Sequence, residues 1–197
     1  QTGLHQMAAG FSMSDGVFHL EYLNFFHPDP LEEAISANGE IVLGPDGFAD
    51  ATIDMSIEIE SLDLAELGLA QDLSGKLSFH GHANGDLLDP TVVGDLSVEG
   101  PGWQAYAAET LVGEVEWAEG TVRISHGEVG IAGERVCFSG QMEFAPQFKL
   151  DLMTQVGNAS LATLLSAYEG APSLAGQVSG NVALSVGSGG VSGNGTL

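Results

Sequence analysis

Apolar and polar residues alternate along most of the chain with a period of two. Because successive side chains of a strand point to opposite faces, this alternation predicts β-strands with one apolar and one solvated face, as antiparallel sheets commonly have. The predicted common apolar face consists of Leu77, Phe79, Leu96, Val98, Val115, Trp117, Val122, Ile124, Val129, Ile131, Val136, Phe138, Met142, Phe144, Phe148, Leu150, Leu152 and Val178.

Turn-forming residues separate the predicted strands at short intervals, whereas helix-forming segments are scarce. Turns are predicted at residues 45–47, 118–120, 125–127 and 188–190. Asp63 and Ser160 each precede a short stretch that they could cap as a helix, and Asp29-Pro30 predicts a third short helix.

The sequence repeats itself with a period of roughly 100 residues, far longer than one solenoid coil of about 20 to 30 residues. Residues 72–78 align with residues 173–179 at an offset of 101, and residues 11–20 align with residues 115–124 at an offset of 104. We therefore divide the chain into a partial first β-repeat, a complete second one and the start of a third. Their ranges are 1–71, 72–172 and 173–197. Both ends look cut, so we expect a segment of a longer protein.

Composition narrows the class of protein. Glycine supplies 28 of the 197 residues without a collagen-like period, and only 16% of residues are charged, which favours an all-β chain over a disordered one. The formal net charge of −23 would repel a phosphate backbone and excludes nucleic-acid binding. No apolar run reaches the ~18 residues that a membrane-spanning helix needs.

The sequence contains no convincing catalytic or metal-binding motif. His80 and His82 project from one face of a strand, as two metal ligands would, but they occupy its polar phase and we expect them to be solvated. The EF-hand spacing is absent, so no calcium site is predicted. Cys137 lies between Val136 and Phe138 and is predicted to be a buried structural thiol. We predict neither an enzyme nor a cofactor.

A sheet with one apolar face must cover that face. It could close into a barrel, pack as a sandwich, or bend into a U-shaped trough. Two segments carry a resemblance that favours the trough. The segments LSGKLSFHGHANGDLLDPTVVGDLSVEG (residues 73–100) and ASLATLLSAYEGAPSLAGQVSGNVALS (residues 159–185) resemble the repeats of the TamB family, one of the AsmA-like, bridge-like lipid transfer proteins of the bacterial envelope.

The resemblance implies a long, curved, mainly antiparallel sheet folded into a U-shaped trough, the β-taco, with an apolar interior and a few short helices. It implies a periplasmic segment of a longer protein anchored in the inner membrane, which conducts phospholipid acyl chains to the outer membrane. An outer-membrane β-barrel could be a further partner, and the residues of the predicted apolar face would line the groove. The alternative is a structural or adhesin-like β-sandwich with an acidic, cation-binding surface.

Overall fold

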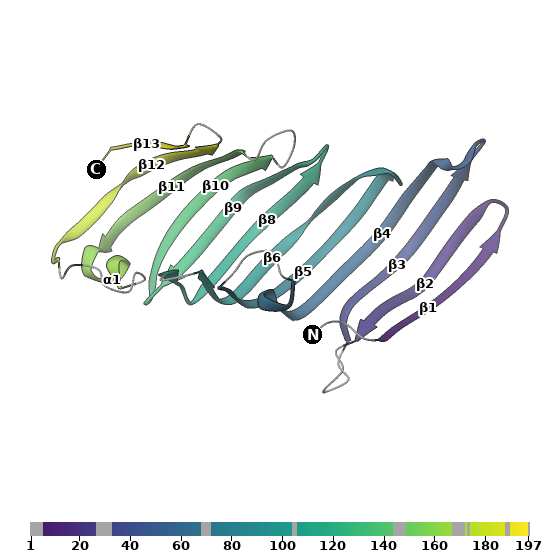
Figure 1. The fold of residues 1–197 in the computed structure, drawn as a ribbon, viewed down its shortest axis with the longest axis horizontal. Coiled ribbons are helices and arrows are strands. Elements are labelled where there is room, and N and C mark those ends of the chain that lie inside the picture. The colour runs from purple at the N-terminus through teal and green to yellow at the C-terminus, as the bar shows by residue number, and fades with distance from the viewer. Residues whose placement is uncertain are drawn as a thin grey trace.

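One open antiparallel sheet makes up almost the whole protein (Figure 1). The computed structural model describes residues 6–26, 33–67, 72–103, 106–143, 149–166, 172, 174–187 and 190–196. The predicted all-β class, with an unclosed antiparallel sheet and very few helices, is confirmed. The third predicted helix, after Asp29-Pro30, falls largely on residues outside the described ranges, and the chain re-enters them at Glu33 as a strand.

The strands follow one another through the sheet in sequence order. They are β1 (Gln6–Ser14), β2 (Val17–Phe26), β3 (Glu33–Gly44), β4 (Gly47–Asp63), β5 (Leu73–Asp86), β6 (Asp89–Trp103), β7 (Tyr106–Ala107), β8 (Thr110–Ala118), β9 (Thr121–Ile131), β10 (Glu134–Glu143), β11 (Lys149–Ser160), β12 (Gln177–Gly187) and β13 (Gly190–Thr196). The short β7 pairs only with β6, which also pairs with β8. A 3-10 helix, η1 (Leu64–Leu67), and an α-helix, α1 (Leu161–Leu165), lie at strand ends (Figure 1).

The hairpins are closed by tight turns whose backbone matches the twist of the strands. Asp15-Gly16 and Glu119-Gly120 both have positive φ angles, 50° and 81° in the first pair and 50° and 71° in the second. Two positive φ angles are typical of the type I′ turn. The turns predicted at residues 45–47 and 118–120 separate strands as expected, whereas residues 188 and 189 lie outside the described ranges.

The turn predicted at residues 125–127 was wrong, because these residues lie inside β9. The pairing of β9 with β8 and β10 shifts register at this point, so the chain forms a bulge and continues as one strand. Gly127 is required by close packing: a Cβ on it would contact the ring of Phe138 on the neighbouring strand.

The internal repeat is visible in the structure as two successive six-stranded units, β1–β6 and β8–β13. Corresponding strands begin 110 − 6 = 104 residues apart for β1 and β8, and 134 − 33 = 101 apart for β3 and β10. The strands β4 and β11 end 160 − 63 = 97 residues apart, each directly before a short helix. The two units share one sheet, since β6 pairs with β8. The predicted boundaries at residues 72 and 173 fall inside these units, where β4 pairs with β5 and β11 pairs with β12.

Equivalent residues of the two units adopt the same unusual local structure. Ser61 and Asn158, 97 residues apart, both have left-handed φ angles, of 51° and 49°. Their backbone N–H groups donate to the hydroxyls of Ser78 at 3.2 Å and Ser179 at 2.7 Å. The register shifts at these residues, between Ile59 and Leu62 and between Val156 and Ala159, so each residue lies in a bulge. A serine at an equivalent position holds each bulge to the next strand.

Both predicted helix caps are present. Asp63 Oδ1 accepts a hydrogen bond of 2.9 Å from the Ala65 N–H at the start of η1. Ser160 Oγ accepts one of 3.3 Å from the Thr163 N–H in α1. These side chains satisfy amide groups that have no partner within the helix.

The described residues form one layer, so very little of the protein is buried. The buried hydrophobic residues are Ala34, Ala51, Ile53, Leu62, Ala83, Val98 and Ala159, and no large side chain is fully buried. The accessible surface is 12244 Å². A compact monomer of 20.3 kDa would expose about 8,800 Å². A one-layer sheet leaves both of its faces accessible, which favours a surface larger than that of a compact monomer.

Replacing Gly39 by alanine should destabilise the sheet strongly. Gly39 has a φ of +152°, and a Cβ on it would contact backbone atoms of Asp54 and Met55 on β4. We expect Gly39→Ala to lower the free energy of unfolding by about 2 kcal/mol or more, measured by urea titration. Gly157→Ala is the control, because a Cβ there meets no atom within 4 Å; equal losses in the two variants would contradict the packing argument.

Candidate functional site

The candidate site is the apolar face of the sheet, which is built from two uninterrupted rows of directly paired residues. Paired residues of an antiparallel sheet share a face, so a row can be followed from strand to strand. The first row consists of Ala9, Leu23, Ala37, Ile57, Gly81, Gly94, Val115, Ile124, Gly140, Leu152, Leu184 and Gly193. The second consists of Phe11, Leu20, Gly39, Met55, Ala83, Val92, Trp117, Val122, Met142, Leu150, Val186 and Val191.

Both rows cross twelve strands and contain only apolar residues and glycine. With a strand spacing of about 4.8 Å, eleven steps give a path about 53 Å long, nearly twice the ~30 Å hydrocarbon core of a bilayer. The path runs across the strands. Glu134, paired with Ile131 where β9 and β10 begin their hairpin, is a charged residue at the margin of this face.

Bulges keep the rows on one face where the sequence changes phase. In β2 the apolar residues change from Phe18 and Leu20 to Leu23 and Phe25, and the register of β2 against both neighbours shifts between Leu20 and Leu23. The equivalent change in β9 occurs at the bulge between Ile124 and Gly127. The extra residue of each bulge absorbs the change of phase, and the apolar face continues without a break.

The residues of the predicted apolar face lie together on this face wherever the structure describes them. Phe144 and Phe148 lie outside the described residues. The remaining members are linked by direct pairs such as Phe79↔Leu96 and Val136↔Val129, or alternate with such residues along a strand. Most are half-buried, but the side chain of Trp117 is 53% exposed, so this face is open to solvent. Their role as a groove lining stays a prediction.

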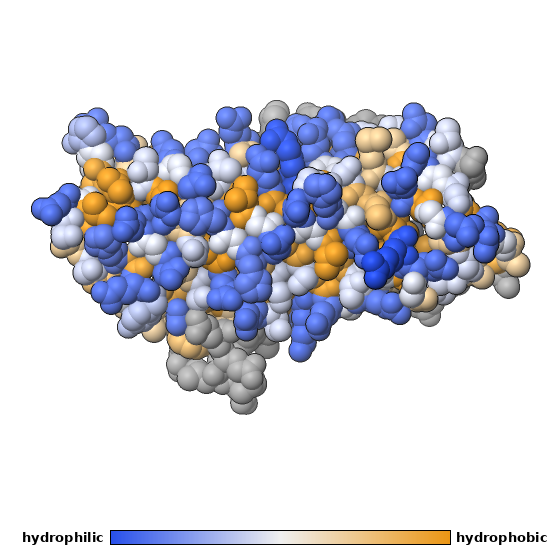
Figure 2. Space-filling model, turned by 180° about the vertical axis from the view of Figure 1, so that it is seen from behind, coloured by the Kyte–Doolittle hydropathy of each residue, from blue (hydrophilic) through white to orange (hydrophobic). Residues whose placement is uncertain are grey.

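The opposite, polar face carries the acidic residues of the strands. Figure 2 shows a face on which hydrophilic groups predominate, with hydrophobic patches between them. Its histidines are paired with carboxylates from neighbouring strands: His19 with Glu40 at 3.1 Å, and His126 with Glu114 at 2.7 Å. These ion-pair partners were missed by sequence reasoning, because strand register decides which acid lies opposite which histidine.

His80 and His82 lie on the polar face, and neither forms a built metal site with the other. His80 Nε2 lies 3.0 Å from Glu58 Oε1, and His82 Nε2 lies 3.0 Å from Asp54 Oδ1. All four side chains remain substantially exposed to solvent. The two histidines are therefore exposed to solvent, as expected. In addition, each lies beside a carboxylate of β4 with which it forms an ion pair when it is protonated.

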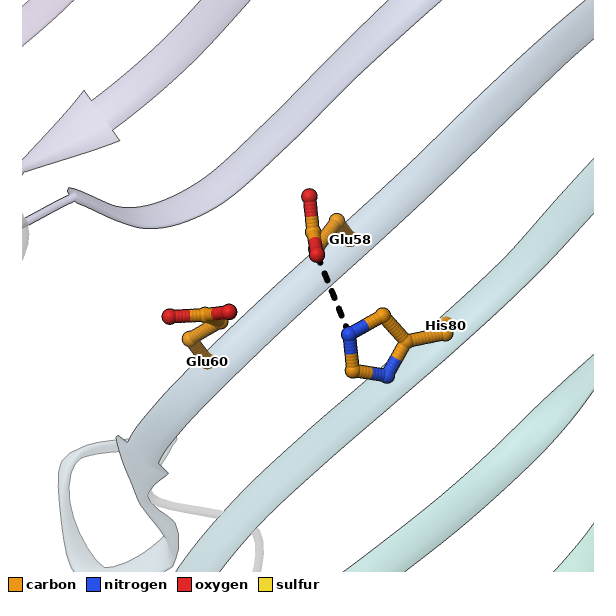
Figure 3. A group of neighbouring side chains, drawn as sticks. All are labelled: Glu58, Glu60 and His80. Carbon is orange, nitrogen blue, oxygen red and sulfur yellow. Dashed lines mark ion pairs between the residues drawn. The ribbon is translucent and has the colours of Figure 1, made fainter.

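Glu58, Glu60 and His80 are the group that comes nearest to a cation site among the described residues (Figure 3). Their potential ligand atoms lie within 4.8 Å of one another. All three are exposed, and Figure 3 marks the ion pair that already joins His80 to Glu58. Because these side chains are exposed, water can hydrate them without a bound ion, and we assign them no metal.

Cys137 was predicted to be buried, and this was wrong. The thiol is exposed on the polar face, where Cys137 lies between Glu128 and Gln155 of the neighbouring strands. The apolar neighbours Val136 and Phe138 are a misleading guide, because alternation sends them to the face opposite Cys137.

A hollow with a volume of about 590 Å³ lies over the polar side of β9–β13. It forms where side chains such as Ser139, Ala183 and Ser185 are small, between Arg123 and Met153. It is separated from the apolar face by the sheet itself. The polar face therefore offers a shallow depression, whereas the apolar face offers a continuous surface.

Two clusters of charged residues on the polar face have shifted pKa values. The pKa of Glu114 is lowered from its usual 4.5 by hydrogen bonds from His126 and Ser125 and by the charge of His126. The hydrogen bond between Lys149 Nζ and Asp151 Oδ2, 2.6 Å long, lowers the pKa of Asp151 and raises that of Lys149. Ser185 also donates to Asp151, at 2.6 Å. These interactions stabilise the charged forms of Glu114, Asp151 and Lys149. The polar face therefore carries exposed ion pairs.

No protein-family model, curated protein or solved structure matches this chain. Among the described residues no helix is both long and apolar enough to cross a bilayer. The class defined by the structure is therefore that of an open, repetitive antiparallel sheet with one apolar and one acidic face.

Monovalent salt should stabilise the protein more than divalent cations do. The 27 acidic residues far outnumber the 4 basic ones, so the excess negative charges repel one another. Salt screens this repulsion. We expect the melting temperature to rise from low salt to about 0.5 M sodium chloride, and to change little on adding EDTA. Glu60→Gln should respond as the wild type does. A melting temperature that rises sharply with micromolar calcium, and no longer does so in Glu60→Gln, would instead establish a cation site.

The Glu114–His126 pair should contribute to stability only above the acid range. Because folding lowers the pKa of Glu114, its contribution is fully present above the unfolded-state pKa near 4.5 and is lost as the pH falls through the folded-state value. Glu114→Gln should therefore melt below the wild type at pH 6, and the difference should vanish toward pH 3. Glu119→Gln, which removes a charge in the β8–β9 turn, serves as control. An NMR titration of Glu114 with a midpoint at or above 4.5 would refute the assignment.

Proposed function

We propose that this chain is a segment of a groove that binds lipid acyl chains and lets them move across the strands of the sheet. The single observation that supports this most directly is the pair of apolar rows that cross twelve strands without a polar interruption. The groove would be lined by the apolar face and bordered by the ends of the strands.

The energetics favour an elongated apolar ligand. Each methylene removed from water contributes about 0.8 kcal/mol, so an acyl chain of about 16 carbons would cost on the order of 12 kcal/mol to expose during transfer. The apolar face itself also gains from being covered, because Trp117 and Phe11 are mostly exposed. A mobile hydrocarbon chain could satisfy both needs without a specific pocket.

The position of the polar side chains also supports a groove on the apolar face. They lie on the opposite face, where they keep the protein hydrated and exclude an apolar ligand from that side. Neither row contains a group that would select one head group. We expect low selectivity, with the head groups in water beyond the strand ends.

The resemblance to the TamB family extends the proposal to a location. We infer a periplasmic segment of a longer, inner-membrane-anchored protein that passes phospholipid to the outer membrane and cooperates with an outer-membrane β-barrel. In such a protein the sheet would bend into a U-shaped trough with the apolar rows inside. The path of about 53 Å in this chain would be one part of a longer route.

The second candidate, an adhesin-like sandwich with a cation-binding surface, has less support. A sandwich needs two packed sheets, and the described residues form one. Its acidic surface is present, but the carboxylates lie exposed beside histidines and basic residues. We propose no catalytic role for this chain.

A charge placed on the apolar rows should weaken lipid binding and leave the fold intact. Trp117→Arg substitutes a side chain that is 53% exposed, so its guanidinium can reach water while it interrupts the second row. We expect at least about a tenfold loss in affinity for a fluorescent fatty acid, a change of about 1.4 kcal/mol. Circular dichroism should show a native spectrum.

A paired substitution on β10 separates the two faces. Phe138→Arg changes the apolar face, and Cys137→Arg places the same charge one residue away on the polar face. Lipid retained on purification, measured by mass spectrometry, should fall in the first variant and stay unchanged in the second. Normal lipid content in folded Trp117→Arg and Phe138→Arg would overturn the proposed function.

A further inference from the structure

Three hollows follow one another across the polar face of the sheet. The hollow over β9–β13 is the last of them, and two others, of about 450 and 320 Å³, lie over β2–β5 and over the strands β5, β6, β8 and β9. His80 lines both of these other hollows. Ser125 and His126, which are adjacent in β9, line the hollow over β9–β13 and the central hollow, respectively. We call this succession of hollows, from β2 to β13, the polar furrow.

The polar furrow follows one row of residues that strand register brings together. In the first part of the row each residue is the direct partner of the next, and these residues are Asn24, Ser36, Glu58, His80, Asp95 and Glu114. The side chains of Ser125 and His126, in the β9 bulge, both contact Glu114. Beyond this bulge the row continues as Ser139, Met153, Ala183 and Asn194. With a strand spacing of about 4.8 Å, the ten steps of the row give a length of about 48 Å.

The middle of the polar furrow is negatively charged. Asp95 and Glu114 are direct partners on β6 and β8, and like charges directly opposite each other destabilise a sheet. Hydrogen bonds from His126 and Ser125 lower the pKa of Glu114 and so keep its carboxylate charged. The other direct partner of Asp95 is His80. Two facing carboxylates therefore lie in the central hollow, and neither has a lysine or arginine as its direct partner.

We propose that the polar furrow binds an extended basic segment of a partner protein, with a lysine or arginine side chain between Asp95 and Glu114. A positive charge at this position would offset the repulsion between the two carboxylates, and a guanidinium group could donate hydrogen bonds to both. The net charge of −23 attracts a basic partner and repels a second copy of this chain. An extended peptide rises about 3.3 Å per residue, so about 14 residues would follow the row from end to end.

The β13 end of the polar furrow suits uncharged residues of such a segment. Asn194 offers an amide group there, and the side chain of Met153, which is 65% exposed, offers an apolar contact. Arg123 also lines this hollow and would repel a further basic side chain. We therefore expect the positive charges of the segment to lie over β4–β8. The polar furrow lies on the face opposite the apolar rows, so the inference does not depend on lipid binding.

Fluorescence anisotropy of a labelled peptide tests whether a basic segment binds. The probe is a peptide of about 14 residues in which serine and lysine alternate, and its control carries glutamine in place of lysine. At low ionic strength we expect the lysine peptide to bind at least about tenfold more tightly than the glutamine peptide. Its affinity should fall as sodium chloride is added, because salt screens the attraction. Equal affinities for the two peptides, or no binding of the lysine peptide, would overturn the proposal.

Asp95→Asn distinguishes a site in the polar furrow from general attraction by charge. Its control is Glu119→Gln, which removes the same charge in the β8–β9 turn. We expect the affinity for the lysine peptide to fall at least about fivefold in Asp95→Asn and less than about twofold in Glu119→Gln. Asp95→Asn should melt no lower than the wild type, because it removes one of two facing like charges. Equal losses of affinity in the two variants would refute the polar furrow as the site.

Disulfide trapping in a Cys137→Ser background tests the position of the peptide. Ser97→Cys places a thiol in the central hollow, and Ser166→Cys places one at the end of α1. Each variant reacts with the lysine and the glutamine peptide, both carrying a central cysteine activated as a mixed disulfide. The ratio of the two rates corrects for the different exposure of the two thiols. We expect this ratio to be at least about fivefold higher for Ser97→Cys, because trapping requires Cα atoms within about 7 Å. Equal ratios would overturn the proposed position.

Discussion

The fold depends on strand register, which keeps the two apolar rows on the same side of a sheet that has no second layer among the described residues. A slip of one residue in any strand would move its apolar side chains to the polar face. The few buried residues, such as Ile53 and Val98, cannot prevent this by core packing alone. Directly opposed side chains, tight turns such as Asp15-Gly16 and the bulges fastened by Ser78 and Ser179 fix the register instead.

The two faces of the sheet differ in the residues that they carry. The carboxylates, histidines and basic residues of the strands gather on one face, where Lys149–Asp151 and His126–Glu114 pair in contact with water. The other face is left free of charge along both rows, apart from its margin at Glu134. A chain with a net charge of −23 can therefore present an apolar surface as long as the sheet itself.

Features that depend on neighbouring residues could be predicted from the sequence, and features that depend on register could not. The all-β class, the repeat, the common face of Phe79 and Phe138, and the caps at Asp63 and Ser160 follow from local patterns. The exposure of Cys137 was missed because its apolar neighbours belong to the other face. The bulge at residues 125–127 resembles a turn in composition, and only pairing with β8 and β10 shows that the strand continues. The resemblance to the TamB family stays a prediction.

The order of the strands has a consequence for how the protein folds and opens. Apart from the step from β6 to β8, neighbouring strands of the sheet are consecutive in the chain, so the contacts between elements join sequence neighbours. Proteins of this kind behave as one-dimensional arrays, in which folding can nucleate at any hairpin and spread to its neighbours. Opening should begin at the two terminal hairpins, and the loss of one would leave the central strands paired. A unit of six strands could then be duplicated without the need for a new type of interface.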